Sequence, residues 1–133
     1  MLYKIELYIT LYQPSIKMEI GKRYIFVGTD NETYTGDVIY VTEIVVIIKN
    51  RSCESYKNSG GLFSTERSLI KWTFPLDDLI EGQRYIFAIH TDDNTSEGTF
   101  MNISGRHDTV HLKIEDGGIN SFTLYCVKNI CMC

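Results

Sequence analysis

The sequence has no run of about 18 apolar residues, and its amino-terminal stretch, MLYKIELYITLY, is interrupted by Lys4 and Glu6. A membrane-spanning helix needs about 20 apolar residues, and a signal peptide needs an unbroken apolar segment. Neither is predicted. We therefore expect an intracellular protein, in the cytoplasm, the nucleus or a virus particle, that is not secreted and does not bind a membrane.

An excess of basic residues is also absent. The chain has 13 lysines and arginines against 17 aspartates and glutamates, which gives a net charge of −4. Non-specific nucleic-acid binding depends on many cations that neutralise phosphates. The charge therefore disfavours a nucleic-acid partner. With 44% hydrophobic and 23% charged residues, the composition is typical of a globular protein.

Recognisable catalytic motifs are missing as well. The sequence contains no P-loop, G-x-G-x-x-G, G-x-S-x-G or H-E-x-x-H pattern. The three histidines, His90, His107 and His111, all lie in the second half, and Asp108 neighbours His107 in sequence only. We expect a protein that is not an enzyme and uses no cofactor.

The cysteines do not have the spacing of a metal site. Cys126, Cys131 and Cys133 form a C-x4-C-x-C pattern, and Cys53 lies far from them. A structural zinc site is typically marked by paired C-x-x-C motifs. We expect no metal, with Cys126 buried in a strand and two mobile thiols at Cys131 and Cys133. In an oxidising setting those two thiols could instead link chains.

What the sequence does contain is an internal repeat. The block GKRYIFV (residues 21–27) matches GQRYIFA (residues 82–88) at five of seven positions, 61 residues apart. The match continues with one inserted residue: four positions of the first copy, Asp30, Thr33, Gly36 and Val41, fall on Asp92, Thr95, Gly98 and Ile103. Such self-similarity indicates a duplicated structural unit.

Each copy has the pattern of a small antiparallel sheet. Residues rich in β-branched and aromatic side chains predict a first strand at the repeat block, a second at 37–42 or 99–104, and a third at 45–49 or 110–114. The DGG turn at residues 116–118 predicts a tight hairpin leading into a strand at 121–127. In the first copy a long connection, residues 50–67, precedes the strand at 68–74. A single helical turn is expected at 75–79.

The predicted fold class is therefore all-β, with two tandem sheets or small barrels related by the repeat. We assign residues 19–80 to the first unit, with its long 50–67 loop, and residues 81–133 to the second, with a cysteine-rich tail. Residues 9–12, ITLY, resemble KWTF at 71–74. Residues 1–18 are accordingly predicted to hold an extra edge strand and a linker.

This pattern resembles the small barrels of the SH3-like class, which includes Tudor and Sm-like domains. The resemblance rests on the Gly-x-Arg-Tyr-Ile-Phe strand, the acidic loop after it, the glycine at the second strand and the short hairpin. It covers most of residues 19–130. In such domains the loop after the first strand often contacts a ligand, so the resemblance implies a binding role for that loop.

The loop after the first strand is acidic in both copies. Carboxylates attract arginine or lysine through charge-assisted hydrogen bonds, and aromatic rings stack on such cations. We predict binding of a protein, for example a basic peptide, by seven residues in and near these loops: Asp30, Glu32, Tyr34, Asp37, Asp92, Asp93 and Glu97. The alternative is a solvated loop beside ordinary core aromatics.

The 50–67 connection is the second candidate site. It interleaves basic and aromatic residues, namely Arg51, Tyr56, Lys57, Phe63 and Arg67. Loops this long are uncommon unless they bind something or are disordered. We place Tyr56 and Phe63 among the candidate ligand-binding residues. The composition suits an acidic protein or a nucleic acid, and equally a surface loop anchored by one aromatic.

Three functions remain open. The first is a non-catalytic interaction module that binds protein through the acidic loops or the 50–67 loop. The second is a structural or assembly subunit, for example of a virus particle, in which the edge strand at residues 3–12 pairs with a neighbouring chain. The third is nucleic-acid binding through the 50–67 loop.

Overall fold

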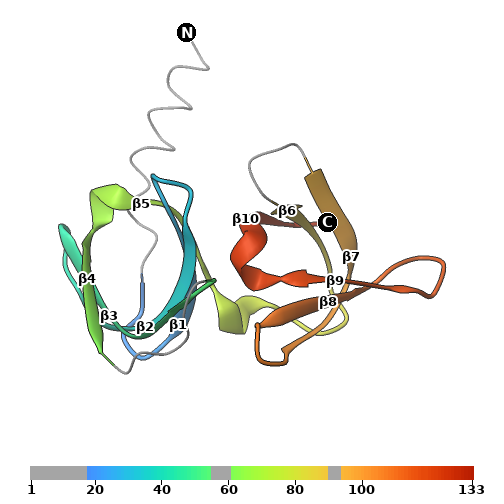
Figure 1. Cartoon of the computed structure of the whole chain (residues 1–133), viewed down its shortest axis with the longest axis horizontal. Coiled ribbons are helices and arrows are strands. Elements are labelled where there is room, and N and C mark those ends of the chain that lie inside the picture. The colour runs from blue at the N-terminus through green and yellow to red at the C-terminus, as the bar shows by residue number, and fades with distance from the viewer. Residues whose placement is uncertain (1–17, 55–60, 90–93) are drawn as a thin grey trace, which may run out of the picture.

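A computed structural model describes residues 18–54, 61–89 and 94–133. Within these ranges the chain forms two five-stranded antiparallel sheets and three short 3₁₀ helices (Figure 1). The all-β fold class and the two-fold repeat of a sheet unit are confirmed. The predicted edge strand at residues 3–12 lies outside the described residues. Within the described ranges, no helix is long and apolar enough to cross a membrane.

The first sheet has the strand order β4-β3-β2-β1-β5. Its strands are β1 (Arg23–Gly28), β2 (Thr33–Val41), β3 (Val45–Cys53), β4 (Leu62–Glu66) and β5 (Ile70–Pro75), and the 3₁₀ helix η1 (Arg67–Leu69) precedes β5. We call this sheet with its loops the first unit.

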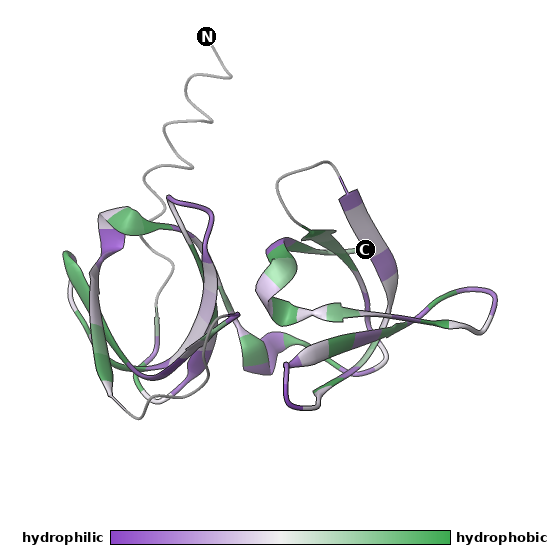
Figure 2. Ribbon diagram, in the orientation of Figure 1, coloured by the Kyte–Doolittle hydropathy of each residue, from purple (hydrophilic) through white to green (hydrophobic). Residues whose placement is uncertain are grey.

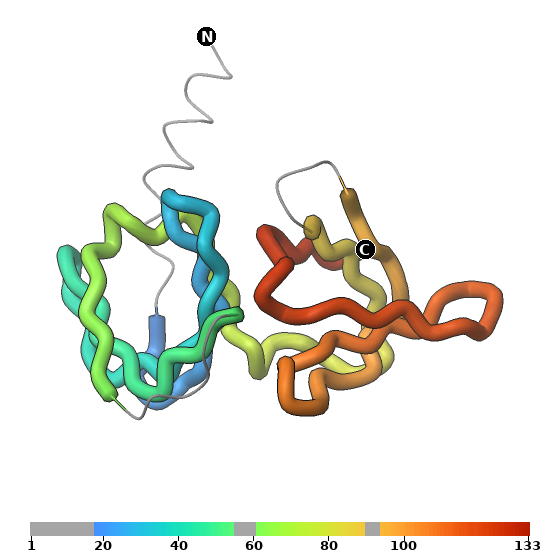
Figure 3. The backbone as a smooth tube through the Cα atoms, viewed as in Figure 1, coloured from blue at the N-terminus to red at the C-terminus, as the bar shows by residue number. Residues whose placement is uncertain are grey.

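The second sheet repeats that arrangement in the order β10-β6-β7-β8-β9. Its strands are β6 (Arg84–Ile89), β7 (Asn94–Ser104), β8 (Thr109–Lys113), β9 (Ile119–Thr123) and β10 (Val127–Met132), with η3 (Leu124–Cys126) before β10. The helix η2 (Leu76–Asp78), at the predicted helical turn, connects the sheets. The tube in Figure 3 shows the two units side by side, with the β8–β9 turn projecting from the second. The unit boundaries at residues 19–80 and 81–133 stay a prediction.

The prediction of a loop over residues 50–67 was wrong at both of its ends, and residues 55–60 lie outside the described part of the chain. β3 continues through the polar residues to Cys53, and β4 pairs with β3 from Leu62 to Glu66. Asn50 has a positive φ of 57°, and the β2–β3 register shifts there, so that Ser52 pairs with Thr35 and is buried. The polar run is thus a strand, and its one hydroxyl group, that of Ser52, interacts with Tyr125 of the second unit, which periodicity alone does not reveal.

The prediction of one strand over residues 121–127 was also wrong. β9 ends at Thr123, whose hydroxyl accepts a hydrogen bond from the Tyr125 N–H at 3.4 Å, and η3 turns the chain before β10 begins. Cys126 is therefore half-buried in η3 rather than buried in a strand. Cys131 lies inside β10, paired with Ile86, rather than in an unstructured tail.

The glycine of the repeat block makes the same turn in both units. Gly21 and Gly82 have φ values of 94° and 90°, which only glycine adopts without strain. Each donates its N–H to a carbonyl of the second strand, Val38 at 2.7 Å and Phe100 at 2.9 Å. This glycine therefore fixes where the first strand enters the sheet.

The tyrosine of the block accepts a hydrogen bond from the segment that precedes the same turn. Tyr24 and Tyr85 are both buried. The Tyr24 hydroxyl accepts a hydrogen bond from the Glu19 N–H at 2.7 Å, and the Tyr85 hydroxyl accepts one from the Ile80 N–H at 2.9 Å. A buried tyrosine hydroxyl group is tolerated when it has such a hydrogen-bond partner. The repeated Gly-x-Arg-Tyr block thus serves folding.

Two hydrophobic cores form, and β1 belongs to both. Tyr24 and Phe26 point into the core of the first unit, whereas Ile25 belongs to the core of the second. On the neighbouring strand, Phe74 pairs with Ile25 and, with Trp72, packs against the second core. Alternate side chains of a strand face opposite sides. The first sheet therefore packs its outer face on the second unit. Figure 2 shows β6 as a largely hydrophobic ribbon inside that unit.

A candidate binding site between the two sheets

Two of the predicted acidic residues, Asp37 and Glu97, form ion pairs within their own units. Asp37 pairs with Arg23 at 3.1 Å and accepts a hydrogen bond from the Asn50 amide, also at 3.1 Å. Glu97 pairs with Arg84 at 2.7 Å in the second unit. Arg23 and Arg84 are the arginines of the two repeat blocks. Asp37 and Glu97 therefore already have a cation within the chain.

Asp30 shapes the turn between β1 and β2. Its Oδ1 accepts a hydrogen bond from the Glu32 N–H at 2.9 Å, an arrangement that lets aspartate replace a backbone turn. Between them, Asn31 has a positive φ of 67°. The carboxylate of Asp30 thus stabilises the turn in which it lies.

Three of the predicted ligand-binding residues, Glu32, Tyr34 and Phe63, surround one guanidinium group. It belongs to Arg51, whose Nη2 lies 2.6 Å from the Glu32 carboxylate. The Arg51 Cζ lies 4.7 Å from the Tyr34 ring centroid and 4.2 Å from that of Phe63. The predicted arrangement of an acid and aromatics around a cation is present, and the chain fills it with its own arginine.

Tyr34 is part of the core rather than of an open surface. It is 5% exposed and stacks on Phe26 with ring centroids 5.2 Å apart. Burial raises the pKa of Tyr34 to about 12, and the Arg51 charge opposes this rise. By contrast, Tyr40 is 52% exposed. The remaining candidates, Asp92, Asp93 and Tyr56, lie outside the described residues.

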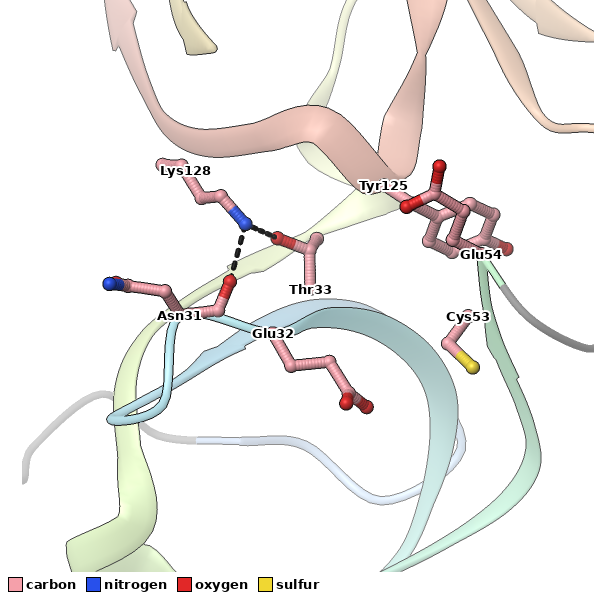
Figure 4. A pocket seen from close by; sticks show the side chains of 7 residues that line it. All are labelled: Asn31, Glu32, Thr33, Cys53, Glu54, Tyr125 and Lys128. Atoms are coloured by element: carbon pink, nitrogen blue, oxygen red, sulfur yellow. Dashed lines mark hydrogen bonds between the residues drawn. The ribbon is translucent and has the colours of Figure 1, made fainter. Parts of the chain in front are cut away.

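A pocket of about 370 Å³ opens where the two units meet (Figure 4). The first unit contributes the turn before β2 and the end of β3, and the second contributes η3 and β10. The lining residues are Asn31, Glu32, Thr33, Cys53, Glu54, Tyr125 and Lys128. Of these, only Glu32 is among the predicted site residues.

Lys128 reaches from β10 across the pocket to the first unit. Its ammonium group donates to the Asn31 carbonyl and, at 3.0 Å, to the Thr33 hydroxyl. Burial lowers the pKa of Lys128. Lys71 holds the same turn from the other side, donating to the Asn31 side-chain oxygen at 3.1 Å. Two lysines from different units therefore fix the turn that carries Asn31.

Tyr125 forms the opposite wall. Its hydroxyl donates to the carboxylate of Asp108. Burial raises the pKa of Tyr125 to about 12 and Asp108 raises it further, while the hydroxyls of Thr35 and Ser52 in the first unit oppose the rise. Thr33 adds a hydrogen bond from its hydroxyl to the Val127 carbonyl at 2.8 Å. The pocket walls are thus held by polar contacts across the junction.

Glu54 directly follows β3 and lines the pocket. No hydrogen bond or ion pair joins its carboxylate to another residue in the part of the chain that the structure describes. Its charge nevertheless acts on the second unit. Burial raises the pKa of the Cys126 thiol, and the negative charge of Glu54 raises that pKa further. Among the described residues, Glu54 is therefore the exposed acidic group of the pocket that has no cation partner, whereas Glu32 pairs with Arg51.

Sequence reasoning missed this pocket because its residues come from both copies. Glu54 and Lys128 are more than 70 residues apart, and no local pattern connects them. The repeat itself was misleading here, because it directed attention to positions shared by the two copies. Thr33 has a matching threonine in the second copy, Thr95, but only Thr33 lines the pocket. The pocket therefore depends on how the two copies meet.

Comparisons with known proteins add no relative: no family model, no curated protein and no solved structure matches the chain. Within residues 18–54, 61–89 and 94–133, no group of three or more histidine, cysteine, aspartate or glutamate side chains is placed to hold a metal ion.

Proposed function

We propose that the chain is a non-catalytic interaction module that binds a basic side chain of a protein partner in the pocket between the two units. The observation that carries the proposal is that a carboxylate from the first unit and an ammonium group from the second line the same pocket. Glu54 offers a carboxylate with room for a cation, and Lys128, on the facing strand, offers an N–H donor.

The two groups match the two polar parts of a peptide. A lysine or arginine side chain would donate to Glu54 through a charge-assisted hydrogen bond. Two of the three ammonium protons of Lys128 go to Asn31 and Thr33, so the third is available to a backbone carbonyl of the partner. Tyr125 supplies an aromatic wall for the aliphatic part of the side chain.

The architecture supports the same proposal. Both units have the same strand order and a 3₁₀ helix before the last strand, in keeping with the resemblance to tandem SH3-like barrels. That resemblance implies that the loop after the first strand contacts the ligand. Asn31 and Glu32, which line the pocket, belong to that loop in the first unit, and Thr33 begins β2 directly after it.

The test is a titration followed by nuclear magnetic resonance. N-acetyl-arginine methylamide is added to the protein, and its neutral citrulline analogue serves as the ligand control. We expect saturable chemical-shift changes at Glu54 and Tyr125 with arginine and much smaller ones with citrulline, because citrulline has the same shape without the charge.

Variants then assign the carboxylate. Glu54→Gln should abolish saturation, whereas Glu66→Gln, which removes an exposed carboxylate from β4, should leave it unchanged. Equal weakening by the two variants would mean that overall negative charge, and not this pocket, attracts the cation. That result would contradict the proposal.

A further inference from the structure

The two sheets end in four edge strands: β4 and β5 in the first unit, β9 and β10 in the second. An exposed edge presents unpaired backbone groups, and proteins commonly protect it with charged residues or proline. Three of these edges carry such protection: Glu66 in β4, Lys71 and Pro75 in β5, and Lys128 in β10. β9, with the sequence INSFT, has neither a charge nor a proline.

The hydrogen-bond pattern of the β8–β9 hairpin shows which backbone groups of β9 point outward. Ile114 donates to the Gly118 carbonyl at 3.0 Å, and Leu124 donates to the Asp108 carbonyl at 2.9 Å. In an antiparallel pair, hydrogen-bonded and non-hydrogen-bonded pairs alternate along the strands. The N–H and C=O groups that point away from β8 are therefore those of three residues, Ile119, Ser121 and Thr123.

This edge is open to an approaching strand. The first three residues of β9 are exposed, and the Ile119 side chain is 60% exposed. Among the described residues no strand other than β8 pairs with β9. Figure 1 shows the β8–β9 turn projecting from the second unit on the side away from the first. Figure 2 shows polar residues at its tip. Ile119, the first residue of β9, directly follows this turn.

The geometry points to a second copy of this chain as the occupant, with β9 pairing antiparallel to β9 of that copy. Placing Ser121 opposite Ser121 of the second copy satisfies the outward groups of both strands, because Ile119 then faces Thr123 in two symmetric pairs. Such a two-fold pairing uses one surface twice and closes on itself.

The dimer should be weak. Pairing through one five-residue strand covers less than the about 1,600 Å² of a standard stable interface. We therefore expect association that depends on protein concentration and becomes measurable only in the high micromolar range. This inference stands on the β9 edge alone and does not depend on the pocket between the units.

Sedimentation of the full chain tests the inference with two matched variants. Ile119→Lys places a charge on the β9 edge, and Leu62→Lys places one at the first residue of β4, where Leu62 is 67% exposed. We expect the wild-type protein and Leu62→Lys to dimerise alike, and Ile119→Lys to dimerise at least tenfold more weakly.

A disulfide trap gives a second readout. In a Cys131→Ser, Cys133→Ser background, Ser121→Cys would bring two thiols together at the two-fold axis, where the Cα atoms of a hydrogen-bonded pair lie about 5.5 Å apart. Oxidation should link this variant faster than Asn129→Cys, which carries an exposed thiol on β10.

Two results would overturn the inference. One is a wild-type chain that stays monomeric at all concentrations. The other is a dimer that Ile119→Lys leaves intact; if deletion of residues 1–12 then abolishes it, the amino-terminal segment and not β9 forms the contact.

Discussion

At the scale of single residues, the repeat block owes its identity to packing. Tyr24 and Tyr85 place their hydroxyl groups against backbone N–H groups five residues earlier in the chain. Phe26 and Phe87, two residues further on, are completely buried. The repeated tyrosine and phenylalanine of the block thus have the same structural role in both units.

The tyrosine contact can be removed without changing the shape of the side chain. Tyr24→Phe leaves the Glu19 N–H without its acceptor, so we expect the free energy of unfolding to fall by about 1 kcal/mol. Urea unfolding measures the change. Tyr85→Phe should cost a similar amount, and Tyr40→Phe, at an exposed ring, should cost nothing measurable. Equal losses in all three variants would argue against the hydrogen bond.

Arg51 stabilises the first unit chiefly by covering aromatic rings. Its side chain is 13% exposed, while that of its partner Glu32 is 49% exposed. We expect Arg51→Ala to lower the free energy of unfolding by about 2 kcal/mol, because stacking and buried contact are lost. Glu32→Gln should cost under about 1 kcal/mol, as exposed ion pairs contribute little. The reverse order in urea unfolding would make the ion pair the main contribution.

Two buried phenols make the fold sensitive to alkali. The pKa values of Tyr34 and Tyr125 are raised to about 12 from 10. A group whose pKa is raised on folding contributes stability that is complete below its unfolded pKa and is lost as the pH rises toward its folded pKa. The free energy of unfolding should therefore decrease between pH 10 and 12. Tyr125→Phe should show a shallower decrease, and an unchanged slope would contradict this origin.

At the scale of elements, β1 is the strand on which both units depend. Tyr24 and Phe26 on one face fill the first core, and Ile25 on the other face joins the second core beside Phe74. The equivalent of Ile25 in the second unit, Ile86, is only half-buried and pairs with Cys131. The outer face of the second sheet therefore lacks the aromatic pair that joins the units.

This difference gives a matched pair of substitutions. Ile25→Ala should lower the free energy of unfolding by about 3 kcal/mol, because a fully buried side chain leaves a cavity. Ile86→Ala should cost clearly less, since its site is partly solvated. Denaturant unfolding compares the two, and equal costs would show that the junction does not bury Ile25 as described.

The sequence predicts those elements whose side chains alternate and whose turns have a clear signature. The repeat block, the third strands and the DGG hairpin meet that condition. The extension of β3 to Cys53 could not be predicted, because Ser52 is a polar residue that is buried and interacts with Tyr125 of the second unit. The separation of β9 from β10 could not be predicted either, because a short 3₁₀ helix interrupts a run of strand-forming residues. Local patterns do not report such contacts.

At the scale of the whole molecule, the junction between the units is both the main interface and the candidate site. Ile25, Trp72 and Phe74 make it apolar on one side, and Thr33 and Lys128 connect it by hydrogen bonds on the other. The pocket exists only because both sheets contribute to it. Sequence reasoning found the acidic turn that forms part of its rim and missed the strand that faces it.

The most direct test of this account is chemical-shift mapping of the wild-type chain with an arginine-containing peptide amide. We predict that the largest changes occur on both sides of the junction, at Asn31 and Glu54 in the first unit and at Tyr125 and Lys128 in the second. Changes confined to one unit, or no saturable change at all, would contradict the claim that the two units together form the binding site.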